Sequence, residues 1–147
     1  MICKLFRLVG WAYLPNNNPC YNFLMFCKFL SVFIGGGVGA LLRFIASLLS
    51  KKYFMAPIFG TFFVNILGCF LLGLVFGLTL NKINMSETLK LFITVGFLGG
   101  LTTFSTFNLE VFELLKTGKI GMSFLYIFLS CIFGLLFTYL GYLVSKV

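Results

Sequence analysis

The sequence predicts an all-α membrane protein with four transmembrane helices, and three observations support this fold class. Of the 147 residues, 61% are hydrophobic and only 10% are charged, whereas a typical soluble domain has roughly 25% charged residues. Four stretches reach the length of about 20 mainly apolar residues that a spanning helix needs. The connections between these stretches are short, so no room remains for a soluble domain.

The composition also excludes most enzyme classes. The acidic residues are Glu87, Glu110 and Glu113, and the chain contains neither Asp nor His. A Ser-His-Asp triad, a histidine metal site or an aspartyl-phosphate cannot be assembled from these residues. The five cysteines show no C-x-x-C spacing, so they predict neither a disulfide framework nor a metal site. We therefore expect a protein that is not an enzyme.

The net charge of +8 comes from eleven Lys and Arg residues that punctuate the apolar runs. Nucleic-acid-binding proteins cluster such residues on polar faces, so no nucleic-acid partner is expected. Lysines that flank membrane spans instead set topology and meet the anionic lipids of the bilayer.

The chain divides near residue 25. Residues 1–24 include a Pro-Asn-rich turn at 15–19 and show no cleavage pattern of a signal peptide. We expect a flexible or interfacial arm there, unless Met25 is the true start. Residues 25–147 form the transmembrane domain, with spans at about 29–49, 57–80, 91–115 and 122–144.

The first span combines glycines with one cation. Gly35 and Gly39 form a G-x-x-x-G face suited to close helix packing. Arg43 lies six residues before the end of the span, which is about 9 Å at the rise of an α-helix. It either snorkels to the headgroups or places a fixed positive charge near an anion vestibule.

The second span begins at Pro57, which suits the first turn of a helix, and contains one buried amide, Asn65. This side chain offers two N–H donors and one acceptor. It either joins helices by an interhelical hydrogen bond or donates to a dehydrated anion.

The third span has a polar centre, in which two adjacent glycines precede four hydroxyl residues: Gly99, Gly100, Thr102, Thr103, Ser105 and Thr106. Such a sequence predicts an interrupted helix, whose freed backbone groups must be buried in protein or line a cavity. Broken helices at the midplane of the bilayer bind ions. The alternative is an intact helix whose hydroxyls bond to carbonyls one turn back.

Two further polar patterns follow. Glu110 and Glu113 lie before Lys116 and Lys119, and we expect interfacial charge pairing there. In the fourth span, Ser123, Tyr126, Ser130 and Gly134 form a stripe at helical spacing. The stripe is either a hydroxyl-lined track or a helix-packing face.

The lysines near the span ends divide evenly between the two sides. Lys28, Lys82, Lys90 and Lys146 lie on one side, and Lys51, Lys52, Lys116 and Lys119 on the other. Since an imbalance normally sets orientation, this tie predicts insertion in both orientations. Four helices are few to enclose a polar pathway, so we expect an antiparallel pair of identical chains.

Three motifs resemble the CrcB/Fluc fluoride channels: 36–43 (GGxGAxxR), 60–68 (GTxxVNxxG) and 99–107 (GGLTTFSTF). The resemblance covers about residues 25–147. It implies an antiparallel dual-topology homodimer in the cell (inner) membrane that exports fluoride passively and thereby lowers its toxicity in the cytoplasm.

The resemblance also implies roles for individual residues. Asn65 would line each fluoride pathway, and Phe104 and Phe107 would contact the anion through their electropositive ring edges. A structural sodium ion (Na+) would be held at the dimer centre by the carbonyls of Gly99 and Thr102. The remaining polar residues of the pathway would be Ser105, Thr106, Tyr126 and Ser130, and Gly134 lacks the hydroxyl expected next.

Two alternative functions differ in what they require. A small multidrug exporter needs a membrane-embedded carboxylate, and the first span carries Arg43 but no acid. A non-transporting assembly subunit would explain the spans and packing glycines, but not the four hydroxyls beside a double glycine.

Overall fold

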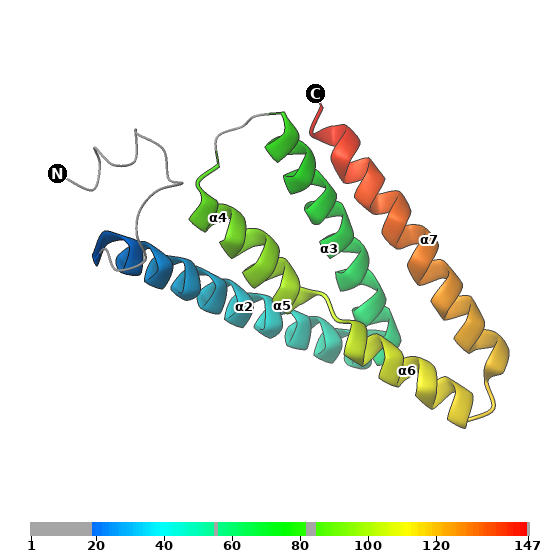
Figure 1. Ribbon diagram of the computed structural model, residues 1–147. Coiled ribbons are helices and arrows are strands. Elements are labelled where there is room, and N and C mark those ends of the chain that lie inside the picture. The colour runs from blue at the N-terminus through cyan, green and yellow to red at the C-terminus, as the bar shows by residue number, and fades with distance from the viewer. Residues whose placement is uncertain (1–18, 55, 82–84, 147) are drawn as a thin grey trace.

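The computed structural model describes residues 19–54, 56–81 and 85–146, and of Pro19 and Cys20 only the backbone. Among these residues, four helical segments are long and apolar enough to cross a membrane, as the sequence predicts. They are α2 (Pro19–Phe54), α3 (Pro57–Leu80), a third span over Glu87–Lys116, and α7 (Ile120–Val144). Figure 1 shows the four spans and their short connections.

The helices extend beyond the predicted apolar cores. Helix α2 begins at Pro19, so residues 19–24 of the predicted arm are helical, while residues 1–18 lie outside the described residues. The third span begins at Glu87 because Ser86 caps it: the Ser86 hydroxyl accepts a hydrogen bond from the Leu89 N–H at 3.3 Å. Glu87 then lies in the first helical turn and pairs with Lys28 of α2 at 2.7 Å.

The third span is interrupted, and this confirms the interrupted-helix prediction over the intact helix. It consists of α4 (Glu87–Leu91), the π-helix η2 (Phe92–Leu98), α5 (Gly99–Leu101) and α6 (Phe104–Lys116). Between α5 and α6, Thr102 (φ −78°, ψ 154°) and Thr103 (φ −150°, ψ 122°) are extended. The sequence did not predict the π-helical turns of η2 before the break. Such turns are frequent at functional sites.

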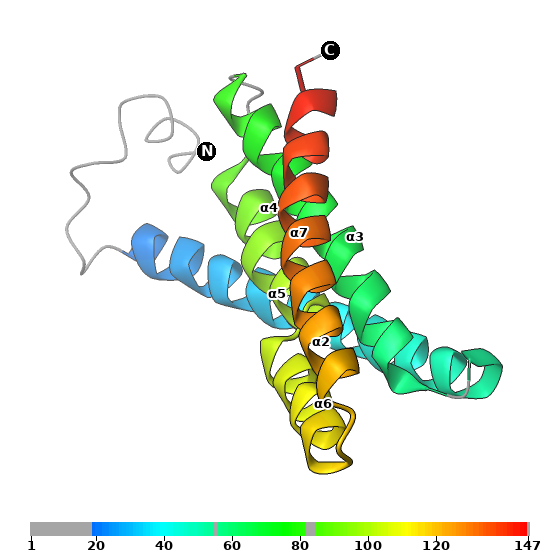
Figure 2. The ribbon, with the colours of Figure 1, turned by 90° about the vertical axis from the view of Figure 1, so that its right-hand side faces the viewer.

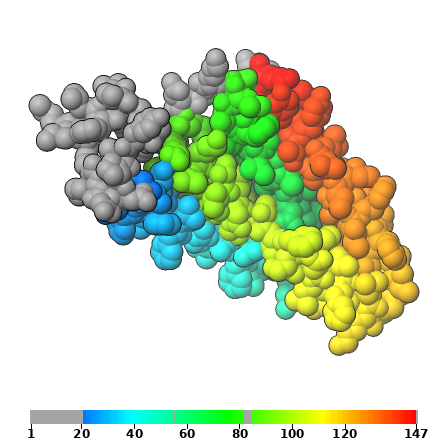
Figure 3. All heavy atoms as spheres, viewed as in Figure 1, coloured from blue at the N-terminus to red at the C-terminus, as the bar shows by residue number. Residues whose placement is uncertain are grey.

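The break changes which helices the third span packs against. Its first half, from α4 to α5, lies along α2, whereas α6 packs against α7 (Figures 1 and 2). Helix α3 contacts α2, η2, α5, α6 and α7 and therefore lies at the centre of the bundle. Figure 3 shows the third span filling the space between α2 and α7 on one face.

Glycines bring α2 and the third span into backbone contact. A Cβ on Gly35 would lie 2.6 Å from the carbonyl oxygen of Phe92, and one on Gly39 would overlap the carbonyl of Phe97. The predicted G-x-x-x-G packing face is therefore confirmed. A Cβ on Gly37, on the other side of α2, would meet no described atom within 4 Å.

The described chain leaves most of its large apolar side chains uncovered. Phe33, Phe104 and Leu135 are 78%, 77% and 76% exposed, and the buried apolar cluster is small, formed by Val64, Leu98 and Leu101. A soluble protein rarely exposes so much contiguous apolar surface. This surface suits a chain that faces lipid and other transmembrane helices.

Two neighbouring glycines provide a matched test of the α2 contact. We expect Gly39→Ala to lower the free energy of unfolding by about 1–3 kcal/mol, because its methyl group meets backbone that cannot move aside. Gly37→Ala should instead be neutral or stabilising by roughly 0.5–1 kcal/mol, since Ala is the better helix former. Thermal unfolding in detergent measures both, and equal melting temperatures for the two variants would contradict the close contact.

Candidate functional site

The backbone groups freed at the break are paired by one side chain from α3. Asn65 Oδ1 accepts a hydrogen bond from the Thr103 N–H at 2.8 Å, and Asn65 Nδ2 donates to the Thr103 carbonyl at 3.2 Å. These two bonds satisfy the N–H and the carbonyl of Thr103, which in a continuous helix would bond to other backbone groups of the same helix. Asn65 thus joins α3 to the break, and it retains a second N–H that these bonds do not use.

The hydroxyl residues after the break form a cap at the start of α6. Thr103 Oγ1 accepts from the Thr106 N–H at 3.2 Å and donates to Thr106 Oγ1 at 3.0 Å. Ser105 Oγ lies 3.3 Å from the same hydroxyl. Thr103 is buried, while Ser105 and Thr106 are exposed. Two of the predicted pathway hydroxyls are therefore gathered around the N-terminus of α6.

The carbonyls before the break have lost their helical partners. The Thr103 N–H, which would bond to the Gly99 carbonyl in a continuous helix, bonds to Asn65 instead. The Thr102 carbonyl faces Arg43, whose Nη1 lies 3.5 Å away. Arg43 thus extends across from α2 to the break, a placement that neither of its sequence interpretations anticipated.

A groove of about 480 Å³ opens beside the break and brings together residues from α3, the third span and α7. It is lined by Asn65, Gly68, Cys69, Leu72, Thr94, Leu98, Gly99, Thr102, Thr103, Phe104, Phe107, Ser130 and Cys131. Six of the predicted site residues therefore meet at one groove: Asn65, Gly99, Thr102, Phe104, Phe107 and Ser130.

Two phenylalanines follow the break on one side of α6. The rings of Phe104 and Phe107 stack with centroids 6.1 Å apart and an interplanar angle of 29°. Phe107 also contacts the Tyr126 ring of α7, at 4.9 Å and 56°. Phe104 is 77% exposed, so its ring extends away from the single chain.

A buried carboxylate lies one turn beyond Phe107. Glu110 is 5% exposed, and its two oxygens accept hydrogen bonds from Thr61 Oγ1 at 2.6 Å and from the Tyr126 hydroxyl at 2.8 Å. The expectation that Glu110 pairs with lysines at the interface is wrong. Helical periodicity could have indicated that Glu110 faces the same side as the break, because Thr103, Phe107 and Glu110 recur at i, i+4 and i+7.

The stripe on α7 divides into paired and unpaired groups. The hydroxyls of Ser123 and Tyr126 donate to the Val111 carbonyl and to Glu110. Ser130 Oγ is buried and has no hydrogen-bond partner among the described residues. An unpaired buried hydroxyl costs free energy, so Ser130 is the member of the stripe best suited to bind a ligand.

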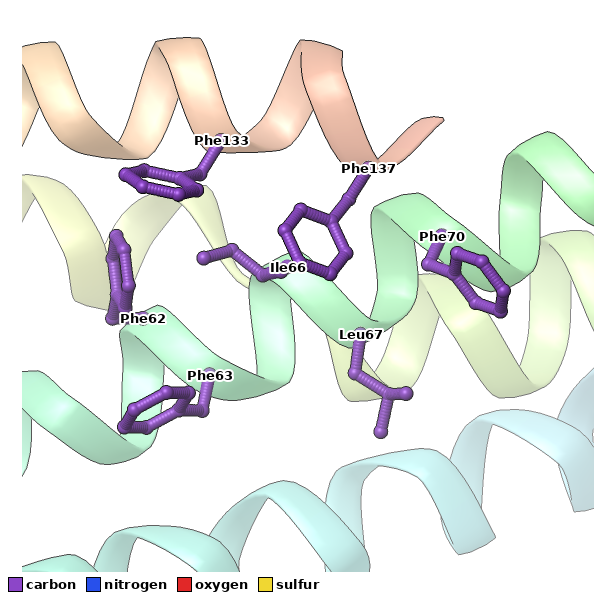
Figure 4. Close-up of a pocket in the computed structure, with 7 residues that line it drawn as sticks. All are labelled: Phe62, Phe63, Ile66, Leu67, Phe70, Phe133 and Phe137. Carbon is purple, nitrogen blue, oxygen red and sulfur yellow. The ribbon is translucent and has the colours of Figure 1, made fainter. Parts of the chain in front are cut away.

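A second groove, of about 600 Å³, is purely apolar. It is lined by Phe62, Phe63, Ile66, Leu67, Phe70, Phe133 and Phe137. Figure 4 shows Phe133 and Phe137 extending from α7 toward α3. This groove offers no hydroxyl or amide, so a strongly hydrated ion would find no replacement for its water there. The polar groove at the break is the candidate ion site.

One family model and several fluoride-specific ion channels match most of this chain. Residues 30–142 match the family model described as CrcB-like protein, Camphor Resistance (CrcB). The chain is 42% identical over 124 residues to the fluoride-specific ion channel FluC of Azobacteroides pseudotrichonymphae genomovar. CFP2, which covers 83% of this chain and 98% of that protein. It is 43% identical over 114 residues to the fluoride-specific ion channel FluC 2 of Staphylococcus saprophyticus, covering 78% and 93%. With the FluC of Campylobacter jejuni it shares 44% identity over 118 residues, covering 80% and 96%.

The Asn65–Thr103 pair makes a stability prediction. Asn65→Ala should lower the free energy of unfolding by about 1–3 kcal/mol for each Thr103 backbone group left unpaired. The control is Asn108→Ala, which removes an exposed amide that bonds to the Phe104 carbonyl within α6 and should cost far less. Thermal unfolding in detergent compares the two. A loss in Asn65→Ala no greater than in Asn108→Ala would show that the break does not depend on Asn65.

Proposed function

The chain belongs to the CrcB/FluC family of fluoride-specific ion channels, and on this premise we propose that it conducts fluoride passively and so exports it from the cytoplasm. The observation that carries the proposal is the groove at the break, where an amide, a buried unpaired hydroxyl and two aromatic rings converge. A channel is not an enzyme, so this site has to bind and release an ion without bond chemistry.

The donors at the groove match the chemistry of fluoride. Fluoride is small and holds its water tightly, so a pathway must replace hydration with close N–H and O–H groups. The unused N–H of Asn65 and the hydroxyl of Ser130 are such groups. The N-terminus of α6 adds helical N–H groups and the positive end of a helix dipole. We assign Ser105 and Thr106 to the same donor set because they flank this N-terminus.

Phe104 and Phe107 supply the aromatic part of the pathway. An aromatic ring has a negative face and a positive edge, so it solvates an anion only edge-on. The two rings stack with 29° between their planes, and both line the groove. Tyr126 extends this aromatic surface from α7 and is held by Glu110.

A sodium ion at the dimer centre fits the donor chemistry of the break. The Gly99 carbonyl lacks its helical partner, and the Thr102 carbonyl has only the long contact with Arg43 among the residues that the structure describes. Carbonyl oxygens are suitable ligands for a hard cation, and Gly99 and Thr102 would hold it. When bound, sodium supplies positive charge that satisfies these carbonyls. Arg43 is a second fixed positive charge at the same place and favours anions nearby.

An antiparallel homodimer completes the proposal. Phe104 and Gly99 are exposed in the single chain although both line the groove, so a second copy would close the groove on that side. The balanced lysines allow both orientations in the membrane.

The buried Glu110 is the one feature that a second candidate mechanism, fluoride movement coupled to protons, would require among the described residues. A membrane-embedded carboxylate is what a proton-coupled transporter needs, and Glu110 is such a carboxylate in the third span. Two hydroxyls already hold Glu110, which suits a structural role better than a proton carrier.

Fluoride efflux separates these mechanisms. Liposomes that contain the purified protein should release fluoride when a potassium diffusion potential is applied, and clamping the proton gradient at zero should not change the rate. Efflux that requires a proton gradient would establish coupling and contradict the channel mechanism.

In the same liposomes Phe104→Ile should reduce flux per folded protein strongly. The control Phe112→Ile replaces a ring of similar exposure on α6 that is not among the groove residues.

Dual topology makes a labelling prediction. In a cysteine-free background, single cysteines at Met85, before the third span, and at Thr117, after it, should each react with a membrane-impermeant maleimide from both sides of the cell membrane. Exclusive labelling of one position from outside and of the other from inside would establish a single orientation and contradict the antiparallel homodimer.

A further inference from the structure

Helices α3 and α7 run in the same direction and place their polar positions in pairs, which we call the polar ladder: Thr61 with Tyr126, Asn65 with Ser130, and Cys69 with Gly134. The members of each stripe are four residues apart, so successive pairs are separated by about 6 Å. Thr61 and Tyr126 bind the same carboxylate, and Asn65 and Ser130 line the same groove. These contacts establish which residue of α3 lies beside which residue of α7.

In the third pair only Cys69 carries a side chain. Gly134 has no hydroxyl, and a Cβ at this position would lie 3.6 Å from the sulfur of Cys69. The Cys69 thiol therefore borders the space that a side chain at position 134 would enter. Cys69 also lines the polar groove and is a free thiol, bound in no disulfide with the described residues.

The ladder ends after this pair. Thr138, the next residue of the α7 stripe, already donates its hydroxyl proton to the Gly134 carbonyl at 2.9 Å. Opposite it, a Cβ on Gly73 would overlap the Thr138 carbonyl, so the two helices are in backbone contact there. At this level the contact leaves no space for an ion between the two helices, and the Thr138 hydroxyl is already bonded.

We propose that the Cys69 thiol is the third donor of the fluoride pathway and takes the place of the hydroxyl that Gly134 lacks. The inference rests on the proposed fluoride conduction. A thiol is a weak hydrogen-bond donor, and in this position it extends the series of donors from Asn65 and Ser130 by one helical turn. The site recognises a small anion that accepts hydrogen bonds.

The test measures fluoride efflux per folded protein in liposomes for a set of Cys69 variants. Cys69→Ala should reduce flux by about twofold, the low end of what one hydrogen bond is worth, because a thiol is a weak donor. Cys69→Ser keeps a donor and should conduct at least as well as the unmodified chain. The double variant Cys69→Ala with Gly134→Ser restores a hydroxyl from the opposite helix and should recover most of the lost flux. Cys27→Ala, on α2 and not among the groove residues, is the control for loss of a thiol.

A packing role for Cys69 predicts a different pattern. In that case Cys69→Val, which fills a similar volume without a donor, would conduct normally, and Gly134→Ser would not rescue Cys69→Ala. Either result would overturn the inference, as would equal losses in the Ser and Ala variants. Cys69→Val also decides the question if Cys69→Ala does not fold. Absence of efflux from the unmodified chain would instead contradict the proposed function itself.

Discussion

A helix interrupted inside a membrane must find partners for its backbone groups, and the arrangement of this protein follows from that constraint. No water is present in the hydrocarbon to pair a free N–H or carbonyl. Asn65 pairs both groups of Thr103, which requires α3 to lie directly against the break. The third span can then leave α2 and continue along α7. The most central helix is thus the one that carries the amide.

Glycines set the distances at which these polar contacts operate. Gly35 and Gly39 place α2 in backbone contact with the third span, and Gly73 does the same for α3 and α7. Helix packing in membranes has little hydrophobic driving force, so such close contacts determine the geometry. The aromatic side chains between the glycines fill the remaining volume. Because the glycine contacts hold the register of α3 and α7, polar residues four apart on each helix meet in pairs.

The two sides of the break differ in polarity, because α5 ends there with carbonyls and α6 begins there with N–H groups. The carbonyls at the end of α5 are suited to a cation and the N-terminus of α6 is suited to an anion, because the two half-helices meet with opposite ends. Arg43 lies close to the carbonyl side, whereas Glu110 lies one turn beyond Phe107 and is held by two hydroxyls. In a family of fluoride-specific channels, this segregation gives a physical reason to assign the anion to the α6 side.

Hydrophobic length and composition determined the four spans, and the run from Gly99 to Thr106 determined the break, because these are local properties of the chain. The partners of each polar group were decided only by tertiary structure. Asn65 had two equally good interpretations until α3 was placed against Thr103. Glu110 looked interfacial because charged residues follow it in the sequence, yet the packing of α6 against α3 and α7 buries it between Thr61 and Tyr126. The proximity of Cys69 to Gly134 likewise depends on how closely α3 and α7 approach. A local pattern such as Gly35-x-x-x-Gly39 marks a face suited to close packing, but which residues meet on that face is decided by contacts between segments far apart in the sequence.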